Sequence, residues 1–415
     1  MKGRTALGAA VGVVCVGLAL SAGPTFAGTG TTTSTTFAFQ GSGFGTRVIG
    51  GQLPAGSDTT GYQRIGCTNQ AGRSRANNVA QADLPGLGTA YDVETRVWTT
   101  ASHGVVATHS THSIAEIVLS QSQLGSLALT GISSRAKAYH DGSGFHAVTS
   151  TDVGGLTFTP AGGQAQSYPA PTPDQPVAIP GVATVYAGEH TTQESRSSAV
   201  ADAFALRVDV VASGTTVQVA HSHASLTGGF TGGVFRGHSA GTHVVTAGGD
   251  IAKSGPNPLN VIGCTGTDGK VYEKSLAQID LGGQLVVTGA TSSELGTQEA
   301  HGAHGYSRAE IEGVNLGGQL EIDGIVARAG VRRTSDGLER SVRGTRLGSV
   351  TVNGEQQTFP KTGMLKIPGV AKLERRVVTR TPRGVSVIGL RITLLDGSGA
   401  VVNLAEASLR IRPLS

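Results

Sequence analysis

Phe39-Gln-Gly-Ser-Gly-Phe-Gly-Thr-Arg-Val48 recurs in the second half of this 415-residue chain as Phe235-Arg-Gly-His-Ser-Ala-Gly-Thr-His-Val244. Self-similarity at a long, nearly fixed spacing is typical of tandem copies of one structural unit. These two stretches therefore decide how the rest of the chain is divided.

Five further pairs of matching stretches follow the opening pair in the same order, and their separation drifts only from 196 or 197 residues down to 183. They are Ile65-Gly-Cys-Thr68 with Ile262-Gly-Cys-Thr265, Leu127–Ala136 with Leu320–Ala329, Ile179-Pro-Gly-Val-Ala183 with Ile367-Pro-Gly-Val-Ala371, Leu206-Arg-Val208 with Leu390-Arg-Ile392, and Ala224-Ser-Leu226 with Ala407-Ser-Leu409. We expect copy 1 at residues 37–232 and copy 2 at residues 233–415, after a flexible segment at residues 28–36. Copy 1 has extra loop residues, chiefly the proline-rich stretch 167–176.

Within each copy the local pattern predicts β-hairpins. Residues 127 to 140 alternate between apolar and polar positions, Asp141-Gly142 is a turn signal, and residues 145 to 151 resume the strand pattern. Copy 2 repeats this around Asp336-Gly337, Asn353-Gly354 and Asp396-Gly397. The one modest helical candidate is residues 198–206. The sequence therefore predicts an all-β protein of two sandwich- or barrel-like modules, and it does not choose between these architectures.

The N-terminal residues have the pattern of a cleavable export signal. Lys2 and Arg4 precede an apolar run at residues 6 to 20, and a small residue, Ala27, ends the segment. We expect residues 1–27 to be removed and the mature chain to be secreted and extracellular. Cys15 lies inside the run and is expected to be discarded with it. No later stretch is long and apolar enough to cross a membrane.

Charge argues against one class of partner and suggests another. The whole chain carries a net charge of only +4, which argues against general nucleic-acid binding. Residues 28 to 234 have a net charge of −3 and residues 235 to 415 a net charge of +5. Candidates for binding an anionic cell-envelope polymer are the arginines on strand-like segments of copy 2, in particular Arg328, Arg332, Arg333, Arg375 and Arg376. Another surface protein is the alternative partner, and solvated strand faces are the simpler explanation of these charges.

Two cysteines remain after the signal is removed, Cys67 and Cys264, and they occupy matching positions in the two copies. An even number of cysteines in an oxidising compartment is usually bridged, so we expect a disulfide between the copies. Two buried free thiols are the alternative.

The sequence contains one apparent catalytic motif, and its surroundings do not fit that motif. Gly237-His-Ser-Ala-Gly241 has the letters of a nucleophile elbow, but Thr242 to Ala247 favours a strand where that motif needs a helix. The corresponding residues of copy 1 place Gly43 where Ser239 stands. Paired carboxylates from distant strands are conceivable for a glycosidase, and the sequence selects no pair. No catalytic residue is assigned.

The histidines offer only a weak metal candidate. His221 and His223 are two residues apart, which places both on one face of a strand. No cysteine cluster or helical His-Glu pair completes a familiar site. We therefore expect no metal and no cofactor, with polar surface positions as the simpler explanation of the histidines.

Taken together, the glycine-rich opening with Gly45-Thr46-Arg47-Val48, the Gly-Cys-Thr at residues 66 to 68 and the Gly-Ile plus Arg-Ala strand resemble the choice-of-anchor P family of uncharacterised secreted proteins from high-GC Gram-positive bacteria. The resemblance covers nearly all of the mature chain and implies no enzymatic activity. The chain departs from anchored members because it ends at Arg410-Ile-Arg-Pro-Leu-Ser415, with no sorting motif and no apolar tail.

These observations favour a secreted, non-catalytic structural or interaction protein of the cell envelope or exterior. The alternative is a secreted hydrolase or metal-binding protein whose carboxylates or histidines one sequence does not identify.

Overall fold

The computed structural model describes residues 31–49, 59–84, 87–121, 124–211, 213–247 and 254–414. The expected signal, residues 1–27, lies outside the described residues. All regular secondary structure in the described part is β-strand, as predicted, and every strand pairing there is antiparallel.

Strands β1 to β14 form two sheets, here named 1A and 1B, and together they make module 1. Sheet 1A contains, in spatial order, β10 (Val177–Ile179), β11 (Ala183–Ala187), β13 (Ser198–Val210), β14 (Thr215–Thr227), β1 (Thr33–Ile49) and β2 (Gln63–Ala71), with β12 (His190–Glu194) also paired to β13. Sheet 1B contains β3 (Ser74–Leu84), β4 (Gly88–Ser102), β5 (Val105–Gln121), β6 (Gly125–Asp141), β8 (Gly155–Pro160) and β9 (Gln166–Tyr168), with β7 (Gly144–Asp152) also paired to β6.

Strands β15 to β28 form sheets 2A and 2B, which make module 2. Sheet 2A contains β16 (Asn257–Val261), β15 (Val234–Thr246), β28 (Val401–Arg412), β27 (Gly384–Leu394), β26 (Ala371–Thr381) and β25 (Met364–Ile367). Sheet 2B contains β17 (Tyr272–Asp280), β18 (Leu285–Glu299), β19 (Gly302–Leu316), β20 (Leu320–Thr334), β23 (Val350–Val352) and β24 (Glu355–Gln356), with β21 (Gly337–Ser341) and β22 (Arg346–Leu347) also paired to β20.

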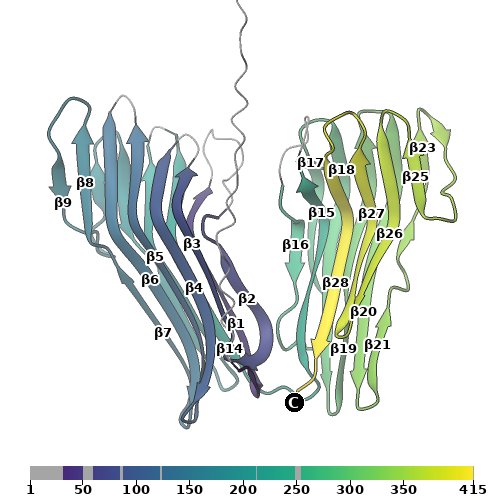
Figure 1. Ribbon diagram of the computed structural model, residues 1–415, viewed down its shortest axis with the longest axis horizontal. Helices are drawn as coiled ribbons and strands as arrows, with labels where there is room; N and C mark the ends of the chain where they lie inside the picture. Colours follow the sequence, from purple (N-terminus) through teal and green to yellow (C-terminus); the bar gives the residue numbers. More distant parts are fainter. Residues whose placement is uncertain are drawn as a thin grey trace, which may run out of the picture.

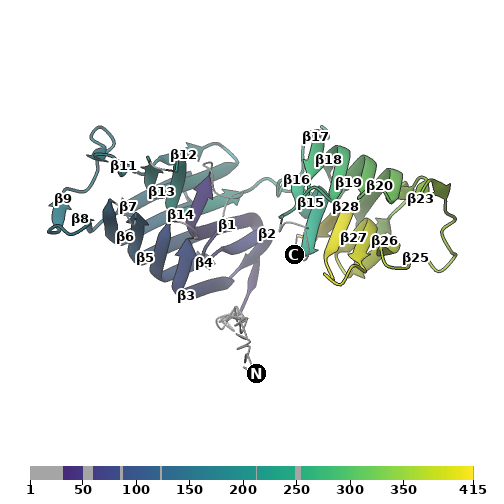
Figure 2. The ribbon, with the colours of Figure 1, turned by 90° about the horizontal axis from the view of Figure 1, so that it is seen from above.

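The two modules are β-sandwiches. Each consists of two separate sheets that face each other across a buried apolar core, as Figures 1 and 2 show. This resolves the choice between sandwich and barrel that the sequence left open. The six-strand main paths of the corresponding sheets match one to one, with β2, β1, β14 and β13 of sheet 1A matched by β16, β15, β28 and β27 of sheet 2A. The short strands β12 and β22 are additional to this match.

Glycine allows the two sheets of module 1 to approach closely. Gly41 and Gly43 on β1 both face sheet 1B. A Cβ atom at Gly41 would lie 2.7 Å from Cγ1 of Val97, and one at Gly43 would lie 2.9 Å from Cγ2 of Thr95. Both distances are too short for carbon atoms, so the repeated glycines of the opening stretch fit the interface between the sheets.

The predicted hairpins are confirmed at Asp141-Gly142, Asp336-Gly337, Asn353-Gly354 and Asp396-Gly397. The helical candidate at residues 198–206 is wrong, because this segment is the first part of β13. Ala199, Ala201 and Ala203 are each 0% exposed, and their period of two is that of a strand packed on a core. The expected flexibility of residues 28–36 is wrong for residues 33–36, because β1 begins at Thr33, which pairs with Ala71; residues 28–30 lie outside the described residues.

Along the long strands, buried and exposed side chains alternate, and at one level the alternation shifts by one residue. We name this level the reversal row. In β14, Ala224 and Ser222 face the core on one side of Ala220, and Val219 and Val217 do so on the other side. The register is unchanged across the row, because Phe44 pairs with His221 and Thr46 with Val219. Positive φ angles mark this level, at Asp92, Gly131, Ala220, Gly289, Gly324, Arg376 and Ala405.

The reversal row corrects one of the sequence matches. Ala220 and Ala405 occupy the same place in β14 and β28, and Phe39 pairs with Leu226 as Phe235 pairs with Ile411. Leu226 therefore corresponds to Ile411. The match of Ala224–Leu226 with Ala407–Leu409 is out of register by two residues, since both stretches repeat small and apolar residues at the spacing of a strand.

Candidate anion-binding site

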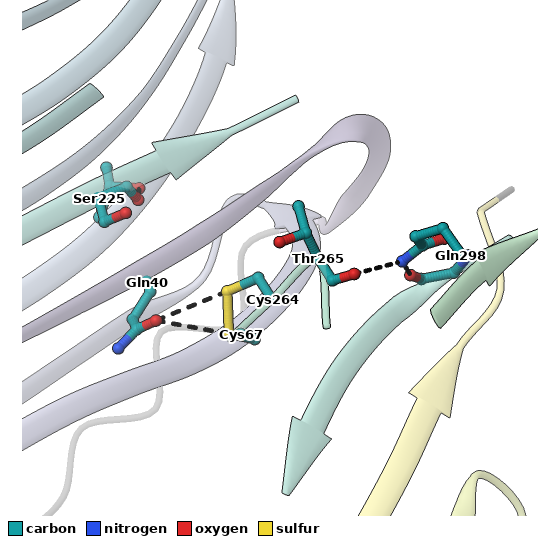
Figure 3. Close-up of a disulfide and its surroundings, with 8 residues drawn as sticks. Gln40, Cys67, Ser225, Cys264, Thr265 and Gln298 are labelled. Atoms are coloured by element: carbon teal, nitrogen blue, oxygen red, sulfur yellow. Dashed lines mark hydrogen bonds between the residues drawn. A yellow bond between two sulfur atoms is a disulfide. The ribbon is translucent and has the colours of Figure 1, made fainter. Parts of the chain in front are cut away.

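The two modules meet where β2 lies beside β15, and a disulfide joins them there (Figures 2 and 3). The sulfur atoms of Cys67 and Cys264 are 1.96 Å apart, so the pairing expected from the sequence is present in the structure. Ala38 and Val234 pack against the disulfide and bury it in a small apolar cluster. Gln40 Oε1 lies 3.4 Å and 3.5 Å from the two sulfurs, a contact without a hydrogen because a disulfide carries none.

Hydrogen bonds between the modules surround the disulfide. Arg412 on β28 donates to Oγ1 of Thr68 at 3.2 Å and to Oε1 of Gln70 at 2.8 Å. Asn69 Nδ2 donates to the carbonyl oxygen of Pro413 at 3.1 Å. These contacts fix the end of β28 against β2, so residues near both ends of the described chain share one junction.

Seven arginines converge on this junction, and we name them the junction arginine cluster. Module 1 supplies three of them, from β2, the β2–β3 turn and β3, and module 2 supplies four, from β15, the β26–β27 turn and β28. The seven are Arg64, Arg73, Arg75, Arg236, Arg383, Arg410 and Arg412. Arg410 and Arg412 project to one side of β28, because Ile411 between them is buried in the core.

The guanidinium groups of the cluster interact electrostatically across the module boundary. Partial burial and then the charges of Arg410, Arg64, Arg75 and Arg73 lower the pKa of Arg236. Partial burial and then Arg383, Arg73, Arg236 and Arg410 lower the pKa of Arg412 to about 10. Arginine remains protonated at neutral pH even so, and the lowered pKa reflects burial first and repulsion between the arginines second.

The described residues provide no acidic partner for this charge. None of the seven arginines forms an ion pair with a described Asp or Glu within 4.0 Å, whereas other described arginines and lysines do, namely Arg207, Arg308, Arg346 and Lys372. Gln70 Oε1 instead accepts from both Arg73 and Arg412, so one neutral oxygen holds two like charges together. Such an arrangement costs free energy unless an anion neutralises it.

Two cavities open between these side chains. One has a volume of about 290 Å³ and is lined by Arg64, Arg236 and Arg410 together with Leu259, Val261 and Ile262. The other has a volume of about 280 Å³ and is lined by Arg236, Arg383, Arg410 and Arg412 with Thr381 and Pro382. Arg236 extends over Gly66, where a Cβ atom would lie 3.1 Å from its Nε. The small residue at 66 leaves room for the guanidinium to reach module 1.

The arginines singled out from the sequence do not gather in one place. Arg328, Arg332 and Arg333 lie on β20 of sheet 2B, whereas Arg375 and Arg376 lie on β26 of sheet 2A. Arg328 lies over the ring of Tyr306 and Arg375 over that of Phe359. Of these five, Arg333 approaches the junction: its Nε donates to the carbonyl oxygen of Ile411, and burial, then Arg340 and Arg383, lower its pKa.

His221 and His223 do face the same side of β14, but both bind one carboxylate. Asp202 Oδ2 lies 3.1 Å from Nε2 of His221 and 2.9 Å from Nδ1 of His223. Although burial opposes it, hydrogen bonding by the two histidines holds the pKa of Asp202 below its usual range. No group of three possible metal ligands is found among the described residues.

Module 2 carries a similar group at the same level of its own sheet. Glu406 on β28 accepts from His238 at 3.3 Å and from His243 at 3.2 Å, and both histidines lie on β15. The hydrogen bond from His238 is the largest influence that lowers the pKa of Glu406 to about 2. These groups are hydrogen-bonded clusters on the sheet surface, and each links two neighbouring strands.

Ser239, the letter match to a nucleophile, is fully buried in β15. Its Oγ donates to Oε1 of Glu294 at 2.8 Å, and Ser307 Oγ donates to Oε2 at 2.5 Å. Burial raises the pKa of Glu294 to about 8. A shifted carboxyl beside a serine is what an enzyme would need, but this pair is sealed between the sheets and lines neither junction cavity.

No known protein-family model matches the chain, and no curated protein matches it. The described part of the chain contains no helix, so it offers no helical candidate for a membrane span.

Sequence reasoning missed the junction arginine cluster because its members are spread from residue 64 to residue 412 and meet only through the packing of the modules. One local signal was present. The Arg410-Ile-Arg412 alternation places two charges on one face of a strand that leads to the disulfide.

Proposed function

We propose that this protein is a secreted, non-catalytic binding protein of the bacterial cell exterior, and that the junction arginine cluster is its binding site for an anionic cell-envelope polymer. The observation that carries the proposal is the convergence of seven guanidinium groups from both modules without a described carboxylate partner. Guanidinium groups present several donors each and suit phosphate, sulfate and carboxylate groups.

Secretion and family membership are parts of the same proposal. An inter-module disulfide is compatible with an oxidising exterior, and the export signal is supported by the sequence of residues 1–27. Membership of the choice-of-anchor P family rests on the sequence motifs alone.

The proposal is tested with residues 28–415 and a simple anionic polymer, dextran sulfate, by isothermal titration calorimetry at two salt concentrations. We expect binding that weakens with salt, because surface charges are screened. The double variant Arg64→Gln/Arg236→Gln removes one cluster arginine from each module and is expected to weaken binding at least about tenfold.

The matched control is Arg135→Gln/Arg343→Gln, which removes one exposed arginine from each module away from the junction cavities. It is expected to bind within about twofold of the unmodified protein. Equal losses in both double variants would show that net charge, and not the junction, controls binding.

A further inference from the structure

The two junction cavities are adjacent subsites of one groove. They share Arg236 and Arg410, which therefore form the wall between them. With volumes of about 290 Å³ and about 280 Å³, the two are nearly equal in size. A ligand that fills both must carry two anionic groups close together, because a single small anion would occupy one cavity and leave the arginines of the other without a counter-charge.

The cavities differ in what surrounds the charge. The first, which we name the apolar-walled cavity, is lined by Arg64, Arg236 and Arg410 and also by Leu259, Val261 and Ile262. The second, which we name the basic cavity, has four guanidinium groups, from Arg236, Arg383, Arg410 and Arg412. The first therefore suits an anion joined to a carbon-rich unit, and the second suits a bare anion with many acceptor oxygens.

The chemistry of the basic cavity favours phosphate over carboxylate. A carboxylate is planar and its two oxygens match one or two guanidinium forks. A phosphate group directs its oxygens tetrahedrally and accepts from several guanidiniums at once, as arginine-rich phosphate sites require. The four arginines come from β15, the β26–β27 turn and β28, so they approach an anion from different directions.

We infer that the groove binds a chain of at least two consecutive phosphate groups, with one phosphate in each cavity and the linking unit against the apolar wall. This inference rests on the proposed function and names its ligand class. Glu406 on β28 is hydrogen-bonded to His238, which lines the apolar-walled cavity, and to His243, so its carboxylate is directed toward these histidines.

The test compares inorganic phosphate, tripolyphosphate and a short glycerol phosphate oligomer in calorimetric titrations of residues 28–415. Tripolyphosphate and the oligomer are expected to bind at least about tenfold more tightly than phosphate, because each adds charge-assisted hydrogen bonds in the second cavity. The oligomer tests the apolar wall, since only it places carbon atoms between the phosphates.

Single arginine variants show which cavity each ligand occupies. Arg236→Gln is expected to weaken all three ligands, because Arg236 lines both cavities. Arg64→Gln is expected to weaken tripolyphosphate and the oligomer but leave inorganic phosphate unchanged, since phosphate alone occupies the basic cavity. Arg383→Gln is expected to weaken all three, and the control Arg135→Gln to weaken none. Far-ultraviolet circular dichroism melting of each variant excludes unfolding as the cause.

The outcomes separate this inference from the proposed function. If dextran sulfate binds at the cluster but tripolyphosphate binds no better than phosphate, the consecutive-phosphate inference is wrong and the proposed function stands. If no polyanion binds, the proposed function itself is wrong. Tighter binding of a single-stranded oligonucleotide than of both phosphate chains would overturn the inference in favour of nucleic acid.

Discussion

The interiors of the two modules differ at one matched position. In module 1, Val97 pairs with Ser110 across β4 and β5, and Gly43 of sheet 1A lies opposite. In module 2, Glu294 pairs with Ser307 across β18 and β19, and Ser239 lies opposite. The same place in the fold is therefore apolar in one module and contains a buried carboxyl in the other.

The comparison shows that the buried carboxyl of Glu294 depends on the hydroxyls of Ser239 and Ser307 for its hydrogen bonds. Glu294 lies within hydrogen-bonding distance of the hydroxyls of Ser239 and Ser307. When Glu294 is protonated, its own O–H donates to one of these hydroxyls, and that serine donates instead to a backbone carbonyl, of Ser293 for Ser239 or of Ser408 for Ser307. Module 1 has glycine in place of Ser239, so one of these partners is missing there. A buried polar group is tolerated only where its hydrogen bonds are made.

The largest effect on stability is expected from placing a buried carboxyl in module 1, where Gly43 provides no hydroxyl in place of Ser239. Val97→Glu should lower the free energy of unfolding of module 1 by at least about 3 kcal/mol. Urea titration followed by the fluorescence of Trp98 measures this, because the chain has a single tryptophan and it lies in module 1. The control Val148→Glu places the same charge at a side chain that is 51% exposed, and should change stability by less than about 0.5 kcal/mol. Equal stability of the two variants would contradict the comparison.

Glu294 should make the stability of module 2 fall as pH rises. Its pKa is raised to about 8 in the folded state, so the unfolded chain releases this proton near pH 4.5 while the folded chain keeps it. The stabilisation that protonated Glu294 gives module 2 is fully present below about pH 4.5 and is lost progressively up to about pH 8, by roughly 3 kcal/mol or more. Glu294→Gln keeps the hydrogen bonds without an ionisable group. Circular dichroism melting should find this variant insensitive to that pH range, and a parallel decline in both proteins would contradict the assignment.

Glu406, on the outer face of sheet 2A, should make the stability of module 2 fall as pH decreases, which is opposite to the effect of Glu294. Its folded-state pKa of about 2 lies below the ordinary value, so its contribution is present above about pH 4.5 and is lost as pH falls through 2. The stability advantage of the unmodified protein over Glu406→Gln should be about 2 kcal/mol at pH 6 and should shrink toward pH 2. Thermal melting at a series of pH values measures it. An advantage that stays constant between pH 6 and pH 2 would exclude this carboxylate as its source.

The smallest effects are expected at the reversal row, where different residues adopt one backbone conformation. Arg376 has a φ angle of 52° and Gly131 one of 61°, and both positions are exposed. Arg376→Gly should stabilise module 2 by up to about 1 kcal/mol, whereas Gly131→Ala should destabilise module 1 by about 1 kcal/mol. Arg376→Ala serves as the control for the lost charge. Equal melting temperatures for the Gly and Ala variants at 376 would refute the conformational explanation.

The fold was largely predictable because its hairpins carry local signals. Asp141-Gly142 and Asp336-Gly337 lie between strand patterns and were placed correctly. The reversal row explains why strand limits were harder to read. Leu127 and Leu129 face the core at odd positions of β6, and Ala136 and Ala138 face it at even positions, so a single period of two does not span the strand.

The candidate site was predictable only in part. Cys67 and Cys264 were paired from their matching positions and the expected compartment, without any geometric information. The junction arginine cluster depends on how two sandwiches pack, and neighbouring residues in the chain carry no trace of that packing. The arginines chosen from the sequence share a module but lie on two different sheets.

The disulfide also determines how the molecule would transmit a mechanical load. Tension applied to the two ends of the chain would pass from Cys67 directly to Cys264, which are 197 positions apart, and bypass the segment that they enclose. That segment contains β3 to β14 of module 1 and also β15 and β16 of module 2, so the backbone of these strands would carry no tension while the bond is intact, whereas β1 precedes Cys67 and would carry it. The fully extended length of the enclosed segment, about 650 Å, becomes available only after reduction. The covalent link would therefore divert the load away from strands β3 to β16 but not from β1.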